Sequence, residues 1–73
     1  MSASVWCQKV DGDLTSELHE NMHDAIESLG VTLDSHEKRG HTIVESRLNN
    51  EPYVIFSIKD ADGNQANTYW IED

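Results

Sequence analysis

The chain has 73 residues, and its 14 Asp and Glu residues against five Lys and Arg residues give a formal net charge of -9. Such an excess of negative charge argues against direct binding to nucleic acid or to an anionic membrane surface. A chain of this length makes one small α+β domain, residues 1–73, which buries only about 60% of the surface that its unfolded form exposes. So thin a core is compatible with further stabilisation by a homodimer or by docking onto a partner.

The single cysteine, Cys7, cannot form an intramolecular disulfide, so the chain does not resemble a disulfide-stabilised secreted miniprotein. No stretch approaches the roughly 18 consecutive apolar residues that a transmembrane helix needs. The N-terminal sequence MSASVWCQKV also has no apolar run of signal-peptide length. We therefore expect a soluble, cytoplasmic protein.

Residue type and spacing predict the first elements. Residues 5–10 alternate loosely and carry Val and Trp, which favours a strand, and residues 11–13 contain the Asp-Gly pair typical of a turn. Over residues 14–29 the apolar side chains recur at the spacing of one helical face. Asp13 is the expected N-cap of this helix and Gly30 its expected C′ residue. The apolar stripe consists of Leu14, Leu18, Met22, Ala25, Ile26 and Leu29.

The rest of the chain predicts strands. Residues 31–33 form a short candidate strand, and residues 34–40 are polar enough to predict a loop. Residues 41–48, 53–59 and 66–72 then predict a meander of three antiparallel strands, separated by Asn-Asn and Asp-Gly turns.

Together these elements predict an α+β fold: an N-terminal strand, one amphipathic helix and then a three-stranded antiparallel meander, with the helix packed on one face of the sheet. Period-two alternation places Tyr53 and Ile55 on the face that a single helix leaves uncovered, where a Trp or Tyr would extend an apolar contact surface. The predicted core consists of Leu18, Met22, Ile26, Leu29, Val54, Phe56 and Ile58, with Trp6 or Trp70 closing an edge.

The predicted helix also carries a row of carboxylates, at steps of three, four and three residues, nearly opposite its apolar stripe. No Lys or Arg on that helix neutralises the row. Carboxylates ordered in this way can imitate nucleic-acid phosphates and bind a basic protein surface, whereas the simpler interpretation is a solvated face that keeps the chain soluble. The candidate partner-binding residues are Glu17, Glu20, Asp24 and Glu27, with Asp11 and Asp13 near one end of the helix.

The segment HENMH at residues 19–23 matches the HExxH pattern, in which two histidines one helical turn apart bind zinc and the Glu polarises its water. A catalytic zinc needs a third protein ligand, and the extended motif fails because Ile26 and Leu29 occupy its Gly and third His positions. The alternatives are a zinc site built on His19 and His23, or two histidines at the edge of the apolar stripe.

We expect a small, acidic, non-catalytic protein–protein interaction module without a cofactor. In this interpretation it is an inhibitor or regulator that presents its carboxylate row to a basic, nucleic-acid-binding surface of a protein partner. The first alternative is a zinc-binding protein or zinc-dependent hydrolase that uses His19, Glu20 and His23. The second is a structural subunit that docks through an open sheet face, on its own copy or on a larger assembly.

Overall fold

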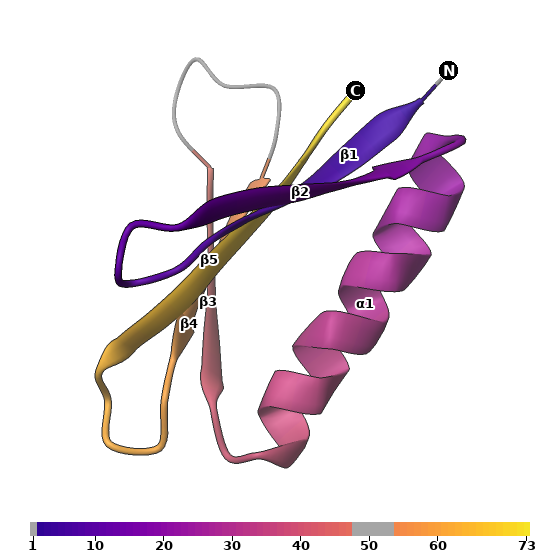
Figure 1. Cartoon of the computed structure of the whole chain (residues 1–73). Helices are drawn as coiled ribbons and strands as arrows, with labels where there is room; N and C mark the ends of the chain where they lie inside the picture. Colours follow the sequence, from indigo (N-terminus) through magenta and orange to yellow (C-terminus); the bar gives the residue numbers. More distant parts are fainter. Residues whose placement is uncertain (1, 48–53) are drawn as a thin grey trace.

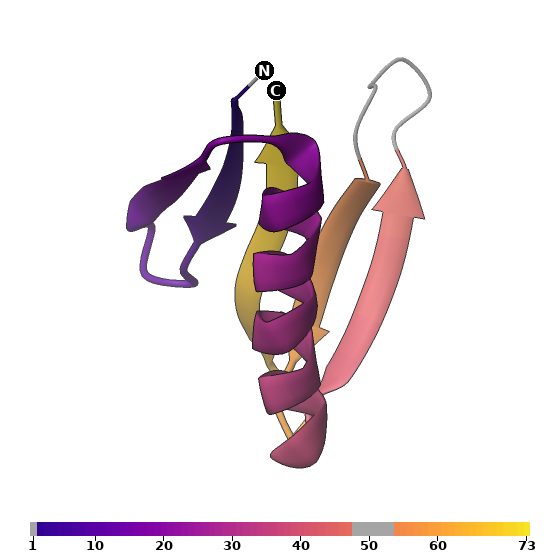
Figure 2. The same cartoon turned by 90° about the vertical axis from the view of Figure 1, so that its right-hand side faces the viewer.

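The computed structural model describes residues 2–47 and 54–73, which form one antiparallel sheet with one helix against it (Figure 1). The sheet has five strands in the order β2-β1-β5-β4-β3, so that β5 lies at its centre. Figure 2 shows that α1 runs along one face of the sheet. The elements are β1 (Ala3–Gln8), β2 (Leu14–His19), α1 (Met22–Lys38), β3 (Thr42–Arg47), β4 (Val54–Lys59) and β5 (Gln65–Glu72).

The fold prediction is wrong in its first half, because residues 14–19 form a strand and not the first turns of a helix. This strand, β2, pairs with β1 in a hairpin whose turn contains Gly12 at a φ of 99°. Leu14 and Leu18 are four residues apart, a spacing that suits one face of a helix and also one face of a strand. The fold remains α+β, but its five-stranded sheet replaces the predicted N-terminal strand, helix and three-stranded meander.

The start of α1 is set by a different residue from the one that the sequence suggests. Asn21, and not Asp13, is the N-cap: its side-chain oxygen accepts a hydrogen bond from the backbone N–H of Asp24 at 2.9 Å. Asp13 instead belongs to the connection between β1 and β2. Capping by Asn satisfies one of the backbone donors that the first helical turn leaves without a partner.

Helix α1 also continues well beyond its predicted end. Gly30 lies inside the helix, and the residues predicted as a strand (31–33) and as a loop (34–40) belong to α1 or to the turn that follows it. The physical reason is burial: Leu33 is half-buried and His36 is buried, so the stripe that faces the sheet extends through these residues. Glycine costs a helix about 1 kcal/mol relative to Ala, and these tertiary contacts outweigh that cost.

The core lies between α1 and the sheet and is centred on Leu29, Ile58 and Tyr69, whose side chains are buried. Burial of Leu29 and Ile58 confirms two members of the predicted core, and Val54 and Phe56 are half-buried. The prediction is wrong for three other residues, which are exposed. One of them lies on strand β2, one is the first residue of α1, and one lies to the side of the helix face that carries the buried Ala25 and Leu29. These residues are Leu18, Met22 and Ile26.

We expect the Asn21→Ala substitution to lower the free energy of unfolding by about 1 kcal/mol, because it removes the hydrogen-bond acceptor at the first turn of α1. Asp13→Ala is the matched control. It is expected to change the free energy of unfolding by less than about 0.5 kcal/mol, since Asp13 is exposed and lies outside the helix. Urea unfolding followed by circular dichroism measures both variants. A larger loss for Asp13→Ala than for Asn21→Ala would contradict this assignment of the N-cap.

Candidate functional site

The pleat of the sheet divides its side chains between a face that packs on α1 and a second face, which we call the open face. Ala3, Ile58 and Tyr69 are buried on the α1 side, so the residues that alternate with them point the other way. Strand pairing then assigns the corresponding positions on the other strands. The apolar members of the open face are Trp6, Leu14, Leu18, Val44, Ile55 and Trp70.

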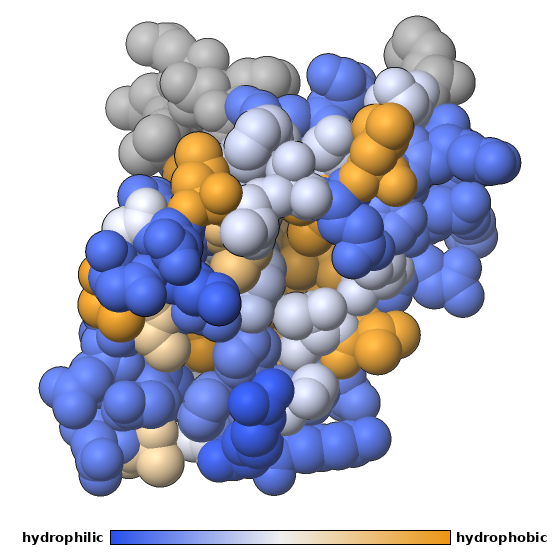
Figure 3. Space-filling view, viewed as in Figure 1, coloured by the Kyte–Doolittle hydropathy of each residue, from blue (hydrophilic) through white to orange (hydrophobic). Residues whose placement is uncertain are grey.

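Trp6 and Trp70 form a stacked pair near the centre of the open face. They are paired across β1 and β5, with ring centroids 6.2 Å apart and ring planes inclined by 7°. The expectation that one of them closes an edge of the core is wrong, because both alternate with residues that face α1. Beyond the pair, Leu18 is 72% exposed and Leu14 is 53% exposed. Figure 3 shows hydrophobic residues reaching the surface among hydrophilic ones.

Ile55 lies on the open face, where period-two alternation places it. Tyr53, which the sequence predicted on the same face, lies outside the described residues. Across the neighbouring strand Ile55 pairs with Ser46, and the other polar positions of this face are mostly Ser and Thr. On the open face, small polar residues therefore lie between the apolar ones.

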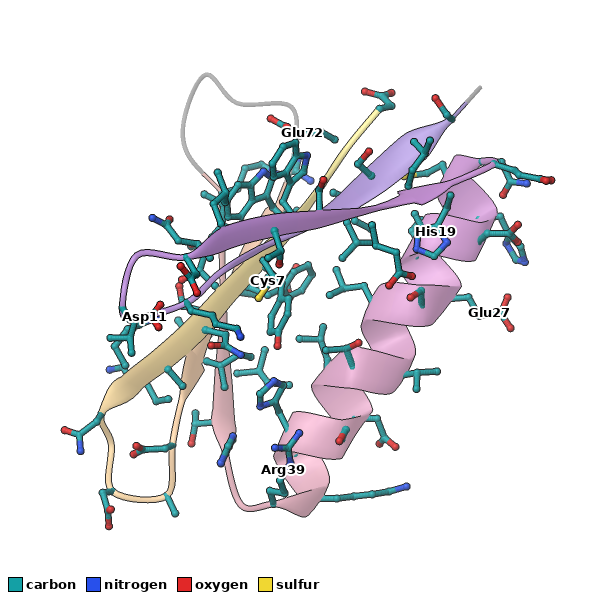
Figure 4. All side chains as sticks on the ribbon, viewed as in Figure 1. Cys7, Asp11, His19, Glu27, Arg39 and Glu72 are labelled. Carbon is teal, nitrogen blue, oxygen red and sulfur yellow. The ribbon has the colours of Figure 1, made fainter. Side chains whose placement is uncertain are left out.

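The open face is nearly free of charge, although the chain carries a net charge of -9. Among its described strand positions the charged residues are Lys59 and Glu72, which lie near opposite ends of the sheet. In Figure 4 Cys7 points toward the α1 side, whereas Glu72 points away from it. The remaining described carboxylates lie on α1, in connecting segments, on the α1 side of the sheet or at the C-terminal residue.

The carboxylate row predicted on one helix is divided among several elements. Glu17 lies on β2, where its Oε1 is 2.8 Å from Nε2 of His19, and Glu20 lies in the connection before α1. Asp24 and Glu27 are exposed on α1 itself. The helical spacing on which the row depends applies to the last two residues only.

Asp11 and Asp13 belong to the turn between β1 and β2, where an Asp11 carboxylate oxygen accepts the backbone N–H of Asp13 at 3.0 Å. Figure 4 shows Asp11 and Glu27 on opposite sides of the molecule. The two turn residues therefore do not lie near one end of an acidic helix, as the sequence suggested.

The HExxH segment spans the end of β2 and the start of α1, so its histidines are not one helical turn apart. His19 lies on the α1 side of β2 beside Glu17, whereas His23 is exposed, with its Nε2 3.8 Å from a carboxylate oxygen of Glu27. Within residues 2–47 and 54–73, no three His, Cys, Asp or Glu side chains group as metal ligands would. The helical geometry that motivates the zinc interpretation is absent from this segment.

A buried polar cluster, which the sequence did not reveal, joins the C-terminal half of α1 to β5. His36 Nε2 lies 2.8 Å from the hydroxyl of Tyr69, and His36 Nδ1 lies 2.9 Å from Nδ1 of His41. The Asn67 amide donates to the same hydroxyl at 3.0 Å. These contacts are satisfied together when Tyr69 donates to His36 and neutral His36 carries its proton on Nδ1, donating to His41. The signal in the sequence was the position of His36, seven residues after Leu29 on the same helical face.

The environment of this cluster favours uncharged side chains. Burial, with smaller contributions from Arg39 and His41, lowers the pKa of His36 from its ordinary value of 6.5. Burial also raises the pKa of the Tyr69 hydroxyl above its ordinary value of 10.0. At neutral pH both groups are therefore uncharged, and the cluster connects α1 to the sheet without an ion pair.

The chain is a small α+β domain with one helix against a five-stranded antiparallel sheet. No protein-family model, no curated protein and no solved structure matches the chain. No match therefore connects the chain to a family of enzymes. Within the part of the chain that the structure describes, no helix has the length and apolar composition needed to cross a membrane.

We expect the free energy of unfolding to fall as the pH is lowered below about 6.5, because unfolded His36 takes up a proton that the folded cluster resists. The contribution is fully present above pH 6.5 and is lost progressively toward the lowered pKa of the folded state. Urea unfolding at pH 7.5 and at pH 5.5 measures the change. His36→Gln is expected to reduce the difference in free energy of unfolding between these two pH values. His23→Gln, at an exposed site, is expected to leave this difference unchanged.

A nuclear magnetic resonance titration of the histidines in the unmodified chain provides an independent measurement, which does not require the His36 variant to fold. A His36 pKa at or above 6.5 in the folded protein would contradict the burial of neutral His36 in this cluster.

Proposed function

We propose that the chain is a small, non-catalytic protein–protein interaction module and that the open face is its binding surface. The observation that carries this proposal is the stacked pair of Trp6 and Trp70 on a sheet face that α1 does not cover. An antiparallel sheet with one solvated face normally carries polar residues there. Here that face also carries two tryptophans and four aliphatic side chains.

The composition of the open face supports this role. The centres of protein interfaces are depleted in charged residues and enriched in aromatic ones, and Trp is among the residues that contribute most to binding. The open face has the stacked tryptophans near its centre, Ser and Thr between the apolar residues, and its described charges toward the ends of the sheet. Stacking also holds the two rings in one arrangement, so binding orders them at little further cost in conformational entropy.

A second candidate function retains the electrostatic interpretation of the sequence, in which the chain regulates or inhibits a partner with a basic surface. The observation that favours it is the acidic exterior of α1, where Asp24, Glu27, Asp34 and Glu37 are exposed. On this side Lys38 pairs with Asp34 at 3.0 Å. Charges of one sign would accelerate association with a basic partner, and this effect would weaken as salt is added.

Photo-crosslinking in extracts of the cells that make the protein distinguishes the two candidates. One variant carries benzoylphenylalanine in place of Ser16, which pairs with Trp6 and lies on the open face. The matched control carries it in place of Val31, which is 69% exposed on α1. We expect discrete covalent adducts from position 16 and few from position 31. Adducts from position 31 alone would overturn the open-face proposal and support the acidic helix as the binding surface.

A further inference from the structure

We infer that the open face binds a second copy of this chain, so that two sheets pack face to face in a symmetric dimer. This inference rests on the proposed function, because it names the partner of the same surface. Three observations carry it: the distribution of charge over the molecule, the positions of Lys59 and Glu72, and the size of the face.

The distribution of charge favours the face-to-face orientation for two chains that each carry a net charge of -9. Like charges that approach closely are destabilising, and self-repulsion keeps highly charged proteins apart. The described carboxylates lie on α1, in the connecting segments and on the α1 side of the sheet, with Glu72 as the exception among the open-face strand positions. Face-to-face packing points the two acidic sides away from each other. Contacts between the α1 sides of both copies bring carboxylates together, and α1 of one copy placed on the open face of the other gives a head-to-tail contact that does not close into a symmetric pair.

The two charged residues of the open face are complementary under one of the two simple symmetries. Lys59 pairs with Gln65 at the start of β5, and Glu72 lies at the end of β5. A two-fold axis in the plane of the interface and perpendicular to the strands reverses the strand direction, so it brings Lys59 of each copy near Glu72 of the other. An axis parallel to β5 instead brings the two Glu72 side chains together. Charge complementarity therefore favours the perpendicular axis.

The dimensions of the face are sufficient for a small dimer. Five strands about 4.8 Å apart, with six to eight residues at about 3.3 Å each, make a face of roughly 20 by 20 Å. Two such faces bury on the order of 1,000 Å² together, which is near the lower limit of a specific interface. The shared interface also adds a second apolar layer to a chain whose own core has only five buried hydrophobic residues among those described.

Sedimentation and light scattering in 0.15 M salt test the dimer. We expect the unmodified chain to have twice the mass of one chain, and Trp70→Ser to have the mass of one chain while keeping its circular dichroism spectrum. Lys59→Glu and Glu72→Lys are each expected to raise the dimer Kd roughly tenfold or more, because each places like charges across the interface. Lys38→Glu, on the exterior of α1, is the matched control and is expected to leave the dimer intact.

Mixing the Lys59→Glu and Glu72→Lys variants provides the decisive measurement. When one copy of each variant forms a heterodimer, position 59 of each copy again faces an opposite charge at position 72 of the other. The equimolar mixture is therefore expected to form heterodimers with a Kd near that of the unmodified chain. Failure of the mixture to recover, while the unmodified chain is dimeric, would overturn the perpendicular arrangement. A monomeric unmodified chain at all concentrations would overturn the dimer itself.

The proposed function can be separated from this inference. A monomer that still crosslinks from position 16 to a different protein rejects the second copy as partner and retains the open face as a binding surface. A monomer without adducts from position 16 rejects both.

Discussion

One helix can cover only one face of a five-stranded sheet, and most features of this molecule follow from that constraint. Helix α1 has 17 residues and so a length of about 25 Å, enough to run along the sheet once. The buried side chains therefore collect in a single layer around Leu29, Ile58 and Tyr69. On every strand, alternate side chains point away from this layer toward the open face, and the stacked tryptophans are among them.

The thin core also explains why a polar cluster has structural importance here. Near its C-terminal end α1 meets β5 through His36 and Tyr69 and not through two aliphatic side chains. A buried hydrogen bond of this kind contributes modestly when it is complete, but an unpaired buried donor or acceptor costs about 1 to 3 kcal/mol. The series of hydrogen bonds from Asn67 through Tyr69 and His36 to His41 has a partner at each step. A shift of α1 along the sheet would break it, so the cluster specifies the position of the helix.

The sequence was sufficient in the C-terminal part of the chain, where strand-forming runs separated by Asn-Asn and Asp-Gly turns predicted β3, β4 and β5. Leu14 and Leu18 fit both a helix and a strand, and only pairing with β1 decides between the two. The interpretations of the carboxylate row and of the HExxH pattern both required one helix over residues 14–29. Because residues 14–19 form β2, the helical spacing that both interpretations needed is absent there. Trp6 and Trp70 are neighbours only through the pairing of β1 with β5, at the two ends of the chain. Long-range register therefore determines the candidate site, whereas the acidity of the chain is visible in its composition.

The negative charge of the chain and its apolar open face lie on different parts of the surface. An exposed apolar face normally makes a small protein prone to unspecific association. Here the described carboxylates other than Glu72 and the C-terminal Asp73 lie on the helix, in the connecting segments and on the α1 side of the sheet. Approach of a second acidic molecule from most directions is therefore electrostatically unfavourable. The open face is the described surface where this repulsion is weakest. Negative charge placed elsewhere on the molecule therefore disfavours contact of the other surfaces with an acidic molecule, whereas the centre of the open face carries no carboxylate among its described strand positions.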